Sequence, residues 1–183
     1  MRRVRFVTVV VAVAGAALLT SISPALGAGT LDFDPPGPPT LSDFTPVTLN
    51  GSPQLSSATL TPFSVTDDTG SGAGWKLVFK MTQLTTGVHS LATGSVTMPA
   101  PVVVPASGNT ATAPIVHDCA GSSALDTAGG CRVAVADPAA PGDGLGSPGT
   151  WLFSPKPLVL TIPNDVFVGT YSSTFTATLS TGP

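Results

Sequence analysis

The chain has 183 residues, of which 42% are hydrophobic and only 9% are charged, and it contains 20 glycines, 19 prolines and no glutamate. Long exposed helices take Glu, Lys and Arg for their outer faces, so this composition argues strongly against a helical bundle. A sequence pI of about 4.9 argues against a basic nucleic-acid-binding protein.

The N-terminal segment, residues 1–27, has the three parts of a secretory signal peptide. Its first five residues include three arginines, residues 6–19 are uncharged and apolar, and residues 24–27 end in small side chains at the spacing that signal peptidase reads. The apolar stretch is shorter than the roughly 20 residues that cross a bilayer. We therefore expect an exported mature protein, residues 28–183, without a membrane span.

Two further points follow from this segment. The Arg2-Arg3 pair also allows twin-arginine export, although the surrounding pattern fits the general route better. Loss of the three arginines changes the formal net charge from −3 for the whole chain to −6 for the mature protein.

Strand patterns separated by Pro-rich and Gly-rich turns follow along residues 28–183, and no stretch has a sustained helical period. In residues 75–83, alternation places on one face Trp75, Leu77, Phe79 and Met81. In residues 169–179, it places on one face Tyr171, Ser173, Phe175, Ala177 and Leu179. The other expected strands are residues 59–65, 95–98, 110–116, 132–136 and 158–162. Many short strands with frequent turns predict a single all-β domain, an antiparallel β-sandwich of Ig-like shape.

Cys119 and Cys131 are the only cysteines and lie 12 residues apart. A redox or metal pair usually has C-x-x-C spacing or nearby histidine ligands, and this pair has neither. Because export delivers the chain to an oxidising compartment, we expect a disulfide that closes a small-residue loop and contributes about 3 kcal/mol. No metal or other cofactor is expected.

Two longer segments carry a family resemblance. Residues 65–79, VTDDTGSGAGWKLVF, place a V-x-D segment and a Gly-rich turn before Trp-x-Leu, here Trp75-Lys76-Leu77. Residues 158–183 contain an apolar strand, a proline, G-T-Y, a Thr-rich strand and a final proline. With these segments in the same order and spacing from Gly29 onward, the chain resembles the WxL family of bacterial surface proteins. One departure is that the second Trp-x-Leu of many members reads Ala177-Thr178-Leu179, and Trp151 begins Trp-Leu-Phe instead.

The resemblance implies a secreted, extracellular protein that attaches non-covalently to the cell wall through peptidoglycan, and the missing second motif bears on that attachment rather than on the fold. The binding residues that it implies are Trp75, Leu77, Gly72, Gly74 and Asp67. A structural reading stands beside it and has more weight for Trp75, because Trp75 and Leu77 share a strand face and so fit one row of a core. The glycines also suit a tight turn, and Asp67 and Asp68 more often cap a turn than bind a cation.

An enzyme is the main competing class. His117, Asp118, Ser122 and Ser123 are the residue types of a hydrolase triad, but within so short a segment they cannot easily align, and no nucleophile elbow is present. Ten aspartates leave a glycosidase pair open without singling one out, and His89 in GVHS is expected to be exposed. We therefore expect a non-catalytic protein. A surface protein that binds other surface proteins through its Ser/Thr-faced strands is the alternative, and a glycan-active hydrolase is a weaker one.

Overall fold

The computed structural model describes residues 6–13, 29–34, 37–139 and 146–183. Within these ranges the chain forms fifteen β-strands and one short 3-10 helix, η1 (Gly121–Ser123), and no α-helix. No described segment forms a helix with the length and apolar character of a membrane span. The all-β class that the sequence predicts is thus confirmed.

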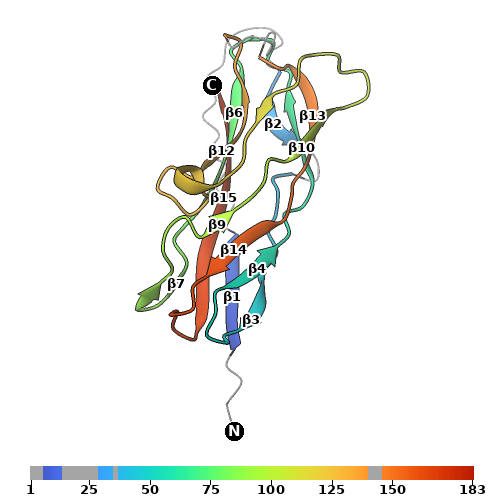
Figure 1. Cartoon of the computed structure of the whole chain (residues 1–183). Coiled ribbons are helices and arrows are strands. Elements are labelled where there is room, and N and C mark those ends of the chain that lie inside the picture. Colours follow the sequence, from blue (N-terminus) through green and yellow to red (C-terminus); the bar gives the residue numbers. More distant parts are fainter. Residues whose placement is uncertain (1–5, 14–28, 35–36, 140–145) are drawn as a thin grey trace.

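The largest sheet contains the family signature and the C-terminal strand. Its order is β11 (Ile115–Val116), β12 (Cys131–Ala136), β6 (Trp75–Met81), β15 (Thr170–Thr181), β1 (Phe6–Val13) and β3 (Phe44–Thr48). A small hairpin of β7 (Thr85–Thr86) and β8 (His89–Ser90) joins it beside β15. β15 runs along most of the elongated molecule and links its two ends (Figure 1).

Two smaller sheets face this one. The first has the order β10 (Val102–Pro105), β13 (Gly149–Ser154), β5 (Phe63–Asp67) and β2 (Leu31–Asp34). The second has the order β4 (Gln54–Ala58), β14 (Leu158–Ile162) and β9 (Val96–Thr97). All strand pairs are antiparallel except β1 with β15. This strand order does not confirm the Ig-like topology, which stays a prediction.

The core lies between the large sheet and the two smaller ones. The four inward residues that the sequence predicts for β6 are all buried, and on β15 Tyr171, Ser173 and Phe175 are buried as well. Phe79 of β6 packs on Phe63 of β5 with ring centroids 5.8 Å apart, and Phe63 stacks on Phe153 of β13 at 4.9 Å. Aromatic packing of this kind joins the sheets and buries a large apolar area.

The predicted disulfide between Cys119 and Cys131 is present, with Cα atoms 5.4 Å apart. Cys131 begins β12 in the large sheet, while Cys119 pairs with Met98 directly after β9 of a smaller sheet. The bond therefore ties two sheets together. Nearby, the buried carboxylate of Asp126 accepts three backbone N–H groups at the start of β9, from Gly94, Ser95 and Val96, at 3.0 to 3.2 Å.

Several predicted strand boundaries are wrong for identifiable reasons. The strand expected at residues 59–65 begins only at Phe63, because Pro62 lacks a backbone donor, and Leu60 makes only an isolated bridge to Leu41. The strand expected at residues 110–116 shrinks to β11, which follows Pro114. Among the strands that the sequence did not predict, β3 and β10 contain prolines and β13 begins at a glycine.

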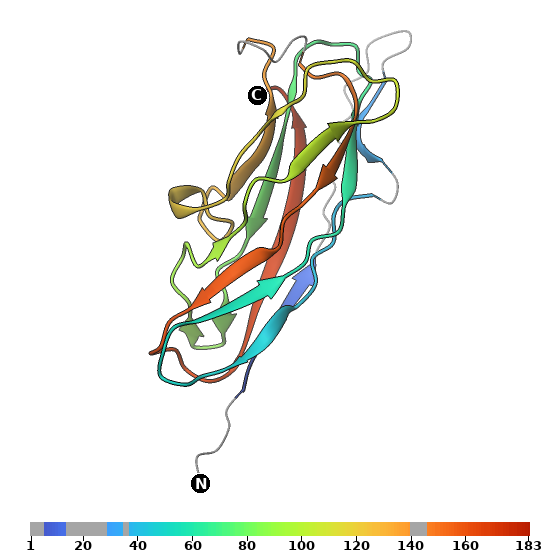
Figure 2. The same ribbon diagram turned by 45° about the vertical axis from the view of Figure 1, so that its right-hand side comes forward.

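An unexpected element lies inside the predicted signal peptide. Phe6–Val13 forms β1, which occupies the position between β15 and β3 (Figure 2). The other residues of the 1–27 segment lie outside the described part of the chain. Its removal, and hence the boundary of the mature domain at residue 28, stays a prediction.

Candidate functional site

The Trp-x-Leu motif lies in the core rather than at the surface. Trp75 and Leu77 are both fully buried on β6. The indole N–H of Trp75 donates to the carbonyl oxygen of Ser147 at 3.3 Å, and the indole N–H of Trp151 donates to the same oxygen at 2.9 Å. Trp75 also meets Phe153 edge to face, with ring centroids 6.4 Å apart. The geometry therefore gives the motif's tryptophan a structural role. This agrees with the interpretation of Trp75 and Leu77 as part of one row of core residues.

The Gly-rich turn before the motif divides into an enclosed and an open part. Gly74 has a φ of +73°, and a Cβ there would lie 1.9 Å from the carbonyl oxygen of Ala136, so only glycine fits. Gly72 also has a positive φ but faces open space. Asp67 is buried and accepts the backbone and hydroxyl hydrogens of Thr69 at 3.1 and 2.7 Å. Of the five residues that the resemblance implied, Gly72 alone has an exposed position.

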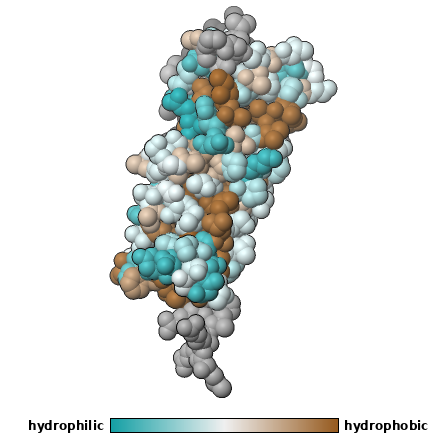
Figure 3. Space-filling view, in the orientation of Figure 1, coloured by the Kyte–Doolittle hydropathy of each residue, from teal (hydrophilic) through white to brown (hydrophobic). Residues whose placement is uncertain are grey.

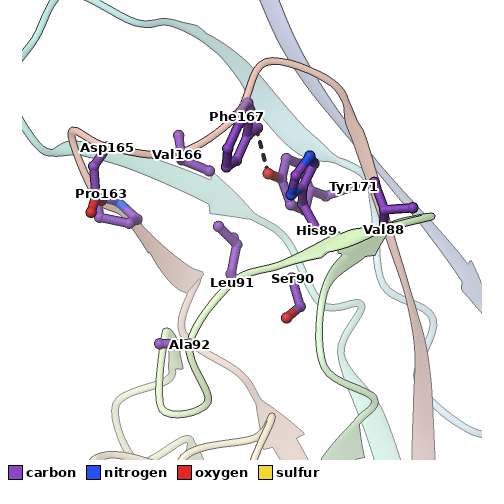
Figure 4. A pocket seen from close by; sticks show the side chains of 10 residues that line it. All are labelled: Val88, His89, Ser90, Leu91, Ala92, Pro163, Asp165, Val166, Phe167 and Tyr171. Atoms are coloured by element: carbon purple, nitrogen blue, oxygen red, sulfur yellow. Dashed lines mark hydrogen bonds between the residues drawn. The ribbon is translucent and has the colours of Figure 1, made fainter.

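A pocket that the sequence did not predict lies at the other end of β15. It has a volume of about 370 Å³ and is lined by the β7–β8 hairpin, the segment between β14 and β15, and the start of β15 (Figure 4). Here the ring of His89 stacks on that of Phe167, with centroids 3.7 Å apart and planes 6° apart. His89 is half-buried in this stack, so the expectation that it is exposed is wrong.

The segment that carries Phe167 is held in place by Tyr171. The phenol of this buried residue donates to the carbonyl oxygen of Phe167 at 3.0 Å. Burial raises the pKa of Tyr171 above its usual value, so the phenol stays protonated and able to donate throughout the neutral range. Phe167 itself remains 60% exposed, and Val88 on the hairpin is 88% exposed. Figure 3 shows further exposed apolar residues, in brown, near both ends of the molecule.

This arrangement can bind a ligand that has both apolar and hydroxyl-bearing faces. An exposed aromatic face carries a partial negative charge that attracts polarised C–H groups, such as those on the face of a sugar ring. Ser90 and Asp165 line the same pocket and offer polar groups for orientation. Because no single sequence motif joins residues 88–92 to residues 163–171, only the fold brings these groups together.

The residues considered for catalysis are placed differently. Asp118 accepts the backbone N–H of Ala100 at 2.6 Å, while the backbone N–H of His117 donates to Val133 at 3.0 Å in the sheet. Ser122 and Ser123 lie on the exposed η1. Within the described ranges, no three His, Cys, Asp or Glu side chains gather as metal ligands.

The comparisons with known proteins agree with the segments singled out above. The model of the WxL family, described as "WxL domain surface cell wall-binding", matches residues 49–183. The match includes β6 with the Trp-x-Leu motif, the disulfide, the pocket and β15, and it begins after β3. No curated protein and no solved structure matches the chain. Because the match covers well over half of its length, the chain belongs to the WxL family and carries a cell-wall-binding domain of the cell surface.

Proposed function

We propose that the domain is a non-catalytic module that residues 1–27 direct to export, and that it attaches non-covalently to peptidoglycan through the pocket between the β7–β8 hairpin and the segment before β15. The observation that carries this proposal is the exposed Phe167 ring, stacked on His89 above the pocket. The family's tryptophan is buried and therefore does not reach a ligand, whereas this pocket offers an exposed aromatic ring.

The chemistry of the pocket favours a glycan over an anionic polymer. Its lining contains one carboxylate, Asp165, and neither lysine nor arginine. An anionic polymer would meet that carboxylate without a compensating cation, whereas neutral sugar rings need only an apolar face and hydrogen-bonding groups. Peptidoglycan provides such rings.

The test is a sedimentation assay with purified peptidoglycan, with and without teichoic polymers attached. We expect Phe167→Ala to weaken binding about tenfold, equivalent to about 1.4 kcal/mol, without a large change in melting temperature because the ring is mostly exposed. Phe167→Leu keeps an apolar side chain and removes the flat ring, so it should weaken binding nearly as much.

Leu152→Ala is the matched control, since Leu152 on β13 is also a partly exposed apolar side chain but lies outside the pocket. Unchanged sedimentation of both Phe167 variants would contradict the proposed site. Failure of the unaltered protein to bind peptidoglycan, combined with binding to whole walls that retain their proteins, would favour the alternative of a protein-binding surface module.

A further inference from the structure

The position of β1 reveals a strand-sized slot in the large sheet. Residues 8–13 of β1 pair in parallel with residues 170–175 of β15, and on its other side β1 pairs with β3. β6 pairs with β15 on the opposite edge, over residues 175–181. β1 therefore fills the gap between β15 and β3, as Figure 2 shows.

This slot bears directly on the mature protein, because β1 belongs to residues 1–27, which serve as the export signal in the proposed function and which we expect to be removed on export. Without β1, residues 170–175 of β15 lose their strand partner on the edge that faces β1, and β3 loses its partner on the facing edge. On the opposite edge Ser172 keeps its pairing with Thr85 of β7, and Phe175 keeps its pairing with Met81 of β6. Unpaired backbone groups at a sheet edge are a template for another strand, and proteins cover such edges or use them for binding.

We propose that in the mature protein this slot receives a β-strand donated by another protein of the cell wall. The donated strand is uncharged, rich in β-branched residues and about eight residues long, as is the segment FVTVVVAV that occupies the slot in the full chain. The two walls of the slot have the same character, since residues 170–175 and Phe44–Thr48 contain no charged side chain. A charged strand would lose hydration there without gaining a partner.

The two sides of the slot differ in how well they pair. The register between β1 and β15 is continuous over six residues. The register between β1 and β3 is irregular between Val7 and Val9, near Pro46, which lacks a backbone donor. β15 is therefore the principal template, and the donated strand lies parallel to it.

A second copy of this chain fits the slot less well than a different protein does. Within the described part of the mature chain, two valine-rich strands resemble the occupant, Val102–Pro105 and Cys131–Ala136, and both already pair with neighbouring strands. Donation of either strand to another copy would break its present pairing, with no net gain of strand hydrogen bonds.

The experiment begins with the protein secreted by a Gram-positive host, whose N-terminus is read by mass spectrometry. A form with Ala25→Arg and Gly27→Arg, which blocks cleavage, keeps β1 attached. Hydrogen exchange followed by mass spectrometry then compares residues 170–175 in the two forms. We expect at least tenfold faster exchange in the cleaved form for those amides of this stretch that face β1. The amide of Thr174, which donates to Thr82, and the β6-paired residues 176–181 should exchange alike in both forms.

The probe is a synthetic peptide of Phe6–Val13 with lysines added at its end for solubility, and the control peptide carries Val10→Pro. We expect the first peptide to bind the cleaved form saturably, restore protection at residues 170–175 and raise the melting temperature. The control should do none of these, because proline interrupts the strand in its middle. The uncleaved form should bind neither peptide.

Three results would overturn the proposal. One is retention of residues 1–27 in the secreted protein, because β1 would then keep the slot filled. Another is equal protection of residues 170–175 in both forms. The third is a cleaved form that is dimeric by light scattering and protected at residues 170–175 only when dimeric, which would make a second copy the occupant. None of these results depends on peptidoglycan, so the sedimentation assay above fails or succeeds separately.

Discussion

At the scale of single residues, the carbonyl oxygen of Ser147 joins the two tryptophans of the core. It accepts both indole N–H groups, from Trp75 and Trp151, and so uses both of its lone pairs. Ser147 is fully buried with a φ of +51°, a conformation that non-glycine residues rarely adopt, and its hydroxyl has no partner among the described residues. The two tryptophans therefore hold a strained backbone in place, a role of the indole N–H that a large apolar side chain without a donor would not fill.

This arrangement predicts that Trp75 acts on stability before it acts on binding. Trp75→Ala should lower the free energy of unfolding by about 3–5 kcal/mol, because it leaves a cavity in the core. Trp75→Phe, which keeps a ring but removes the donor to Ser147, should cost about 1–2 kcal/mol. Urea unfolding followed by circular dichroism measures both values. A Trp75→Ala protein with the melting temperature of the unaltered protein but without wall binding would show that the motif contacts the ligand instead.

At the scale of elements, strands with strict alternation could be predicted and those interrupted by proline could not. Residues 158–162 were predicted at the bounds that β14 has, and β6 and β15 within two residues, because one face of each is buried and the apolar period is clear. β3 and β10 were not predicted because Pro46 and Pro105 indicate interrupted strands. Both strands lie at sheet edges, where proline is tolerated.

The candidate site divides in the same way. The Trp-x-Leu segment and the disulfide are local patterns, so the sequence showed them. The pocket depends on His89 and Phe167, which lie on segments far apart in the chain and meet only because both flank the same end of β15. The only signal in the sequence was the apolar run Val-Phe-Val directly after Pro163-Asn164-Asp165, where a turn rather than a core strand is expected.

The disulfide between Cys119 and Cys131 predicts a limited effect of reduction. Both cysteines are fully buried, so thiol labelling of the native protein should find neither free. Reduction should lower the free energy of unfolding by about 3 kcal/mol and leave the far-ultraviolet spectrum unchanged, because the core between the sheets does not depend on this loop. The comparison requires urea titrations with and without reductant. Labelling of both cysteines without reductant would contradict the bond, and collapse of the spectrum on reduction would contradict the independence of the core.

At the scale of the whole molecule, charge sets how the domain meets the wall. The proposed mature protein, residues 28–183, has a formal charge of −6, and its cations are Lys76, Lys80, Arg132 and Lys156. Teichoic polymers of Gram-positive walls are also anionic, so the long-range interaction with an intact wall is repulsive. Attachment must therefore depend on apolar, aromatic and hydrogen-bonding contacts.

It follows that wall binding should hold or strengthen as monovalent salt rises, because salt screens the repulsion. Sedimentation with teichoic-bearing walls between low and moderately high NaCl measures this directly, and peptidoglycan stripped of these polymers is the control that should show little dependence on salt. Binding that falls steeply with added salt would mean that attraction to a local group of cations dominates over the net charge.

The shared carbonyl at Ser147 also gives the molecule an optical property. The sequence has two tryptophans, and both indoles donate to that one oxygen. Trp75 pairs with Thr181 at one end of β15, whereas the pocket surrounds Tyr171 at the other end, about 30 Å away along the strand. Tryptophan fluorescence therefore reports on the packing around Ser147, and a ligand at Phe167 should not change it directly. A spectral shift on wall binding would thus record a change transmitted through the length of the domain.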